Sequence, residues 1–207
     1  MRSVPLIAIL SLALAGGCSA LTPQSTDRPN LYSLAEAAET PPAVANARPR
    51  AAGGPTLVVS PPHAAAGFDS RRMIYLRQAD KHEYFAHNEW VDTPARMLAP
   101  LIISAVESSG AYRAVVATPS PASGEIRLDT EVLRLQHDFS STPSQVRFTL
   151  RAYLVENATR RVIATREFDA VVPAASEDPH GGVVAASKAV RKVLGELSAF
   201  CAAGARG

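Results

Sequence analysis

The feature that most restricts the fold is a regular alternation of apolar and polar side chains over residues 144–156. The apolar members share the even positions and are Val146, Phe148, Leu150, Ala152 and Leu154. The odd positions between them carry Arg147, Thr149 and Arg151. Because successive side chains of a strand point to opposite faces, the pattern predicts a strand with one buried face and one solvated face.

Other segments of the chain also have strand character. We expect further strands at residues 56–60, 72–77, 83–86, 112–118, 125–138 and 160–172. In the segment 125–138 the apolar phase slips between Val132 and Leu133, which predicts a bulge or a change of face.

Two amphipathic helices complete the expected domain. The first starts at Thr93 as N-cap with Pro94 at the first helical position, and it ends near Gly110. The second follows Asp178-Pro179, and its apolar stripe consists of Val183, Ala186, Val190, Val193, Leu194, Leu197 and Phe200. These elements predict one α/β (α+β) domain over residues 55–207, a mixed β-sheet with helices packed on it, including a C-terminal helix.

The N-terminus has the pattern of an export signal over residues 1–17. Its apolar stretch from Val4 to Ala15 spans only about 18 Å as a helix, too short for a stable membrane span. The residues from Leu14 to Cys18 (LAGGC) resemble a bacterial lipobox, which predicts cleavage before Cys18 and attachment of fatty-acyl chains such as palmitate to it. Cleavage after Ala15, which leaves a periplasmic protein without lipid, is the alternative. In the sorting rule of enterobacterial lipoproteins, which this segment resembles, Asp after the cysteine retains the protein at the inner membrane. Ser19 at that position therefore implies the outer membrane.

Residues 18–54 are expected to form a tether between the anchor and the domain. Residues 19–54 contain nine Ala and five Pro with few large apolar side chains, so they bury too little area to offset their ordering entropy. The alternating segment 31–34 is an exception, and a strand there could pair with an edge of the sheet.

Composition and motifs argue against several classes of function. With 21 Lys+Arg against 19 Asp+Glu, the chain lacks the basic surface of a nucleic-acid binder. Two cysteines cannot supply a four-thiolate zinc site. His82 and His87 are five residues apart rather than four, so they do not match the zinc-protease spacing. Nucleophile-elbow, P-loop, dinucleotide and C-x-x-C motifs are missing, and we expect no enzyme activity, no cofactor and no metal.

Several residues are open to more than one interpretation. Cys201 lies on the apolar stripe of the last helix, which favours a buried structural cysteine over a reactive thiol. Trp90 is expected to be a core or domain-edge anchor, with partner contact as the alternative. Gly181-Gly182 is expected to form a loose first helical turn rather than an anion cradle. The arginines Arg147, Arg151, Arg160, Arg161 and Arg166 are expected on a solvated sheet face, with a site for acidic headgroups or an acidic partner as the alternative.

In the order of these features the chain resembles the ABC-type transport auxiliary lipoprotein family, which includes paraquat-inducible protein C. The shared features are the lipobox, Tyr32 and Leu34, Ile74-Tyr75 with Arg77, the pair Tyr84 and Trp90, the two long strands, and the Ala-rich closing helix with Ala185, Ala186, Ser187 and Ala189. The longer Ala/Pro tether and Ala15 in the lipobox depart from the family.

The resemblance implies a periplasmic domain tethered to the outer membrane that serves an ABC transporter. The implied partner is an MCE-domain protein, together with its permease and ATPase, in systems that move lipids or maintain the envelope. Tyr75, Tyr84, Trp90, Arg147 and Arg151 are our candidate partner-binding residues. Two alternatives stay open: a stand-alone envelope lipoprotein that is an enzyme or binds a small ligand, and a structural lipoprotein of an assembly machine.

Overall fold

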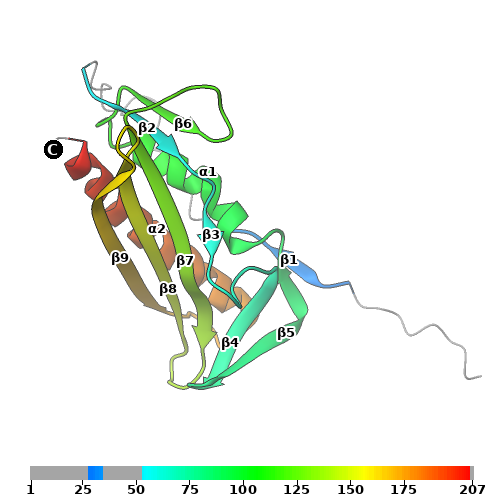
Figure 1. Ribbon diagram of the computed structural model, residues 1–207. Helices are drawn as coiled ribbons and strands as arrows, with labels where there is room; N and C mark the ends of the chain where they lie inside the picture. The colour runs from blue at the N-terminus through cyan, green and yellow to red at the C-terminus, as the bar shows by residue number, and fades with distance from the viewer. Residues whose placement is uncertain (1–27, 35–52, 206–207) are drawn as a thin grey trace, which may run out of the picture.

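The computed structural model describes residues 28–34 and 53–205 (Figure 1). In this part of the chain, nine strands form one mixed sheet, accompanied by two helices. In chain order the elements are β1 (Asn30–Tyr32), β2 (Thr56–Val59), β3 (His63–Ala64), β4 (Arg72–Gln78), β5 (Lys81–Trp90), α1 (Pro94–Glu107), β6 (Ala114–Ala117), β7 (Ile126–Asp138), β8 (Gln145–Glu156), β9 (Arg161–Pro173) and α2 (Pro179–Gly204).

The long strand β7 organises the sheet because both of its edges are paired. Along one edge it runs antiparallel to β8, which in turn pairs with β9. Along the other edge lie β2, β3 and β4 in succession, all parallel to β7. Pro61 and Pro62 have no N–H to donate and separate β2 from β3. The segment 56–78 therefore follows β7 as one interrupted strand.

The predicted slip in this strand is confirmed as a bulge. Val132 is opposite Leu150 in β8, but Arg134 is opposite Thr149, so Leu133 is the extra residue. The bulge keeps apolar side chains on the helix-covered face on both sides of the slip, because Val132 and Leu135 are both buried.

Both helices cover one face of the sheet and lie behind it in the view of Figure 1. The helix α2 packs on β8 and β9, and α1 packs on α2. The buried residues of β8 include the predicted set Val146, Phe148, Leu150, Ala152 and Leu154. Six of the seven residues of the predicted α2 stripe are buried, and Phe200 is half-buried. The α+β fold expected from the sequence is therefore present.

The helix starts differ in their capping. The Asp178 side chain accepts a hydrogen bond of 2.8 Å from the Gly181 amide, which caps α2 as predicted. At α1 the Thr93 side chain makes no capping hydrogen bond. Asp92 instead accepts from the Thr93 amide (2.8 Å). The position of the α1 N-cap was therefore predictable from the sequence, but the absence of a capping hydrogen bond from the Thr93 side chain was not.

A short strand of the segment before the domain joins the sheet. In β1, Asn30, Leu31 and Tyr32 run parallel to Asn88, Glu89 and Trp90 of β5. The Val91 amide extends the pairing with a 2.7 Å bond to the Tyr32 carbonyl oxygen. Leu34, only 1% exposed, enters the core directly after this strand. The strand expected over residues 31–34 is thus present over residues 30–32, and it adds to the β5 edge.

Two glycines of α2 provide a matched test of packing at the start of this helix. A Cβ at Gly182 would lie 2.5 Å from Nδ1 of the buried His137 ring, whereas a Cβ at Gly195 would meet nothing within 4 Å. We expect Gly182→Ala to lower the free energy of unfolding by about 1–3 kcal/mol through overpacking. Gly195→Ala should raise it by up to about 1 kcal/mol through helix propensity. Urea denaturation of both variants measures the difference, and equal effects would contradict this account.

The two leucines of the β1 segment test whether the strand is held through the core. Leu34→Ala should destabilise the docked strand by about 2–5 kcal/mol because a fully buried side chain is truncated. Leu31→Ala is the matched control, since Leu31 is 56% exposed. Hydrogen exchange at the Val91 amide, which bonds to β1, reports the local effect. Unchanged protection in Leu34→Ala would show that Leu34 does not hold the strand.

Candidate docking surfaces

The predicted lipidation residue, Cys18, lies outside the described residues, and its acylation stays a prediction. The other five candidate residues are described. The structure places Tyr75 on β4 and Tyr84 and Trp90 on β5, and it places Arg147 and Arg151 on β8. The two groups therefore belong to different surfaces, which we consider separately.

Arg147 and Arg151 project from the sheet face opposite the helices, which we call the open face. Arg147 Nε donates to both carboxylate oxygens of Asp169 (2.9 and 3.2 Å). Arg151 contacts Glu131 (3.4 Å) on one side and Glu167 (3.1 Å) on the other. Neighbouring strands thus supply a carboxylate for each guanidinium, and the open face is an array of ion pairs rather than a positive strip.

The titration of Asp169 follows from this arrangement. Partial burial alone would raise the pKa of its carboxyl, but the hydrogen bonds from Arg147 and Thr149 more than compensate and lower it. Thr149 Oγ1 donates at 2.6 Å. The carboxylate is therefore ionised at neutral pH and neutralises Arg147. The same hydrogen bond raises the pKa of Arg147.

The three aromatic candidates differ in accessibility. Tyr84 is 42% exposed, and the Arg72 guanidinium lies 4.9 Å from its ring centre. Tyr75 is half-buried and packs against Phe85, with ring centres 4.6 Å apart. Trp90 is only 4% exposed and belongs to the core. Trp90 therefore packs in the core under the β4–β5 pair, as expected of a core or domain-edge anchor. Among the three aromatic candidates, Tyr84 is the side chain that a partner can reach.

His137 occupies the buried junction between β7, the β7–β8 loop and the start of α2. Its Nε2 lies 2.8 Å from Ser144 Oγ, whereas Nδ1 has no hydrogen-bond partner. A cavity of about 20 Å³ beside the ring is large enough for one water molecule. Burial lowers the pKa of His137 despite the nearby carboxylates of Glu177, Asp178 and Asp138, which act in the opposite direction.

Gly181 and Gly182 have a structural role in the same junction. The Gly181 amide is already occupied by the Asp178 carboxylate, and Gly182 provides the space in which the His137 ring lies. The predicted loose turn is in fact closely packed, because a side chain at either glycine would collide with a neighbour. The sequence signal for this contact was the Gly-Gly pair itself, but nothing local identified His137 as its partner.

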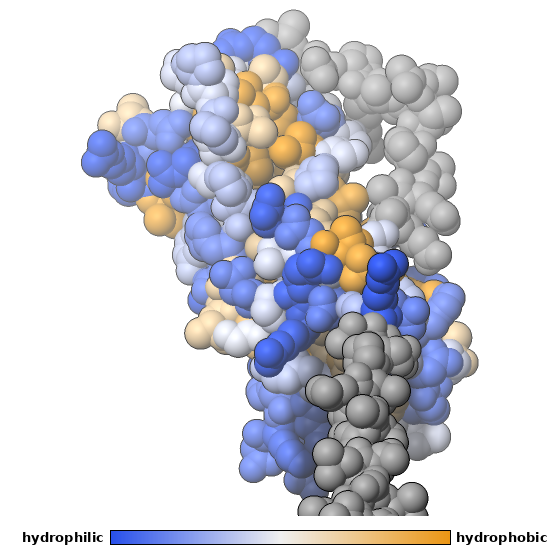
Figure 2. Space-filling view, turned by 90° about the vertical axis from the view of Figure 1, so that its right-hand side faces the viewer, coloured by the Kyte–Doolittle hydropathy of each residue, from blue (hydrophilic) through white to orange (hydrophobic). Residues whose placement is uncertain are grey.

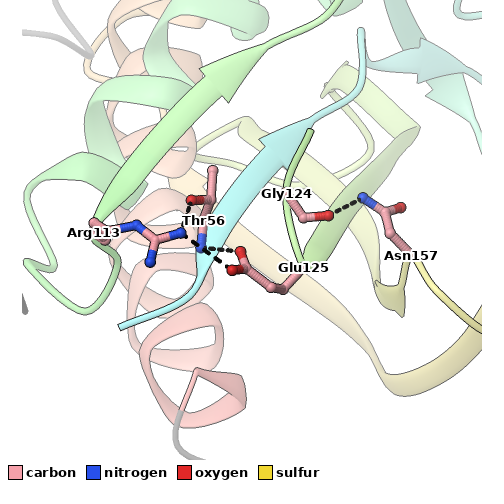
Figure 3. A network of polar contacts seen from close by, with 5 residues as sticks. All are labelled: Thr56, Arg113, Gly124, Glu125 and Asn157. Carbon is pink, nitrogen blue, oxygen red and sulfur yellow. Dashed lines mark hydrogen bonds and ion pairs between the residues drawn. The ribbon is translucent and has the colours of Figure 1, made fainter. Parts of the chain in front are cut away.

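A polar network ties together four chain segments at the other end of β7 (Figure 3). The Glu125 carboxylate accepts from the Thr56 amide (2.7 Å) and from Arg113 (3.1 Å). The Asn157 side chain donates to the Gly124 carbonyl oxygen (2.7 Å). The hydrogen bond from the Thr56 amide lowers the pKa of Glu125. The network fixes the start of β2 beside the start of β7.

An open groove of about 710 Å³ lies next to this network. Its lining includes Arg113, Glu125, Arg161, Ile163 and the last residues of α2. The volume is in the range of small-molecule sites. Acidic, basic and apolar groups alternate along its walls, and this mixture selects no single class of ligand.

Cys201 is fully buried near the end of α2. Burial raises the pKa of its thiol to about 12, so the thiol is protonated at neutral pH. Its carbonyl oxygen accepts a 2.7 Å hydrogen bond from the hydroxyl of Tyr112. These observations assign Cys201 to the core, the favoured interpretation of its position in the sequence.

The two histidines of β5, His82 and His87, are five residues apart along that strand. The ring of His82 contacts Phe68, with ring centres 6.0 Å apart. Over residues 28–34 and 53–205 the structure contains no group of three or more His, Cys, Asp or Glu side chains placed to hold a metal ion. Over the same residues, neither helix combines the length and the apolar character that crossing a bilayer requires.

The buried His137 predicts a pH dependence of stability. Its pKa is lowered in the folded state, so the unfolded chain binds a proton first as the pH falls below about 6.5. Stability should therefore decrease below pH 6.5 by up to about 1.4 kcal/mol per pH unit until the folded-state pKa is reached. Thermal unfolding between pH 5 and 7.5 should show a smaller decrease in His137→Gln. His63→Gln, at an exposed site, is the control, and an unchanged slope in His137→Gln would refute the assignment.

Comparisons with known proteins agree with this fold. A crystal structure of protein XCC0632 from Xanthomonas campestris is similar over 72% of this chain and 84% of its own, with a TM-score of 0.65 and 25% identity. The crystal structure of an uncharacterized protein is similar over 84% of this chain and 99% of its own, with a TM-score of 0.63 and 11% identity. No curated protein matches the sequence.

The family comparison covers almost the whole described chain. The model of the ABC-type transport auxiliary lipoprotein component matches residues 32–198, a range that runs from β1 into the last turns of α2. It includes both surfaces that hold the candidate residues. The protein therefore belongs to the ABC-type transport auxiliary lipoprotein family.

Proposed function

We propose that the protein is a periplasmic lipoprotein, acylated at Cys18 and anchored in the outer membrane, that docks onto an MCE-domain protein of an ABC transport system. The family match over residues 32–198 carries the proposal, because it assigns an auxiliary role in ABC-type transport. The lipobox that ends at Cys18 supplies the anchor. The role is docking rather than catalysis, and the transported molecules are lipids of the envelope.

The outer edge of β9 is the proposed docking surface for the transporter. The strand is 13 residues long and pairs only with β8 among the described strands. Three large apolar residues, Val162, Ile163 and Val171, are between 41% and 52% exposed along it. An unpaired strand edge offers backbone groups to a partner strand, and apolar side chains supply contact area.

The open face beside β9 provides a polar border for this surface. Val171 is opposite Arg147 in the strand register, and Asp169 is opposite Thr149. The ion pairs of Arg147 and Arg151 hold these side chains in fixed positions. Protein interfaces combine an apolar centre with a polar rim in the same way. Arg147 and Arg151 therefore serve as rim residues, which contribute more to orientation than to affinity.

The anchor limits the docking to one surface of the envelope. Several acyl chains, at about 0.8 kcal/mol per buried methylene, hold a lipoprotein firmly in a bilayer. Confinement of both partners to the envelope raises the effective concentration of the domain at the transporter. The proposed mechanism is thus a tethered contact that holds the far end of the MCE assembly at the outer membrane.

Co-purification from detergent-extracted envelopes tests this function. Tagged wild-type protein should recover an MCE-domain protein together with its permease and ATPase, identified by mass spectrometry. Cys18→Ala should leave the membrane fraction because the lipid acceptor is lost. Recovery of the protein alone with a stoichiometric small ligand would replace this proposal with a ligand-binding function.

The docking surface has its own variant pair. Ile163→Glu places a charge on the proposed apolar contact and should reduce recovery of the transporter components severalfold. Ala117→Glu is the control, because Ala117 is exposed on β6, a different edge strand of the sheet. Equal loss in both variants would show that the β9 edge is not the docking surface.

A further inference from the structure

A second exposed surface lies at the opposite edge of the sheet, around β1. We call it the corner patch and define it by Leu31, Arg72, Tyr84 and Val91. Leu31 is 56%, Val91 46% and Tyr84 42% exposed. This edge lies on the side of the molecule that faces the viewer in Figure 2, where hydrophobic groups stand among hydrophilic ones.

The strand register places these side chains next to one another. Glu89 of β5 is opposite both Leu31 of β1 and Arg72 of β4, so all three point to the same face. The Arg72 guanidinium in turn lies over the Tyr84 ring. Val91 directly follows the paired end of β5 and is bonded to β1 through its amide.

Most charged side chains around the patch are paired with one another. Arg71 and Arg72 are both exposed. Glu89 is engaged by Arg71 at 3.6 Å. Asp92, the next carboxylate along the chain, is paired with Arg96 at 3.2 Å. The carboxylates of Glu89 and Asp92 are thus ion-paired, and Arg72 lies over the tyrosine ring beside two apolar side chains.

Covalent geometry adds a constraint that is independent of the patch. Only residues 19–29 separate Cys18 from Asn30, and a fully extended chain of this length spans about 40 Å. If β1 were not part of the sheet, the first fixed strand after Cys18 would be β2, and the reach would be about 130 Å. Pairing of β1 with the sheet therefore places the end of the tether at the corner patch. It also reduces the maximum length of chain between Cys18 and the sheet about threefold.

The composition of the patch matches a bilayer surface. Leucine and valine side chains can enter the boundary between headgroups and acyl chains, and tyrosine is enriched at that level. Arginines near the surface of an anionic membrane are attracted to its headgroups. If Cys18 is acylated, the covalent limit of about 40 Å keeps this patch near the bilayer that holds the acyl chains.

We propose that the corner patch rests on the lipid surface that holds the acyl chains of Cys18, with anionic phospholipid headgroups beside Arg72. This inference deepens the proposed function, because it rests on acylation of Cys18. It orients the domain: the β1 edge lies toward the membrane, and the β9 edge, on the far side of the sheet in Figure 1, faces away from it and toward the transporter.

Site-specific quenching tests this orientation. The full-length acylated protein is reconstituted into vesicles of phosphatidylethanolamine and phosphatidylglycerol, with a fluorophore attached in Leu31→Cys, Val91→Cys or, as control, Ile163→Cys. Cys18 is blocked by its lipid, and Cys201 is fully buried, so each label is specific. A headgroup-attached nitroxide lipid should quench the labels at positions 31 and 91 severalfold more than the label at 163. Equal quenching at all three positions, or stronger quenching at 163, would overturn the inference.

Charge variants separate lipid contact from simple proximity. Combined with Leu31→Cys, Arg72→Glu should reduce quenching, Arg72→Lys should retain it, and Arg161→Glu on β9 should leave it unchanged. An equal effect of Arg72→Glu and Arg161→Glu would also count against the proposed contact.

Two further readouts separate a failure of this inference from a failure of the proposed function. The mass of the N-terminal peptide and flotation with the vesicles report the anchor. A chain that is not acylated and does not float overturns both proposals. An acylated chain that floats but shows equal quenching overturns only the orientation and leaves the docking function intact.

Discussion

The whole domain depends on the pairing of β7 along both of its edges. The antiparallel partner β8 is adjacent in sequence, but the parallel partners β2, β3 and β4 come from the other end of the domain. Parallel pairing of this kind requires a long connection, here made by β5, α1 and β6. Because both edges of β7 are paired, the free edges of the sheet lie further out, at β9 on one side and at β1 and β6 on the other. The two proposed contact surfaces are the edges formed by β9 and β1.

Much of the fold could be predicted from local patterns in the sequence. The alternation in β8, the phase slip at Leu133 and the apolar stripe of α2 each reflect burial on one face, and burial is visible in the sequence as periodicity. Short elements were less predictable. The β5 strand is longer than expected, because its second half is paired with β1 rather than shaped by its own residues. The two-residue strand β3 depends on its register with β7 alone.

The chemistry of the surfaces was less predictable, because it depends on contacts between distant residues. Arg147 and Asp169 are 22 residues apart, and their pairing follows from the register between β8 and β9. Without that register, the arginines of this region resemble a positive strip. The burial of Trp90 was also not predictable from its neighbours in the sequence, because it depends on the distant strand β1 and on the core. Nδ1 of His137 is buried without a hydrogen-bond partner because the start of α2, at Gly182, packs against the ring.

The burial of Cys201 also determines how the domain behaves toward oxidants. Thiol–disulfide exchange needs an accessible thiolate, and this sulfur is neither accessible nor ionised. Once the helix has packed, oxidising surroundings have no route to join two folded domains through this residue. The thiol is therefore open to oxidation only before α2 docks, and packing of this last helix protects the folded chain from intermolecular disulfides at Cys201.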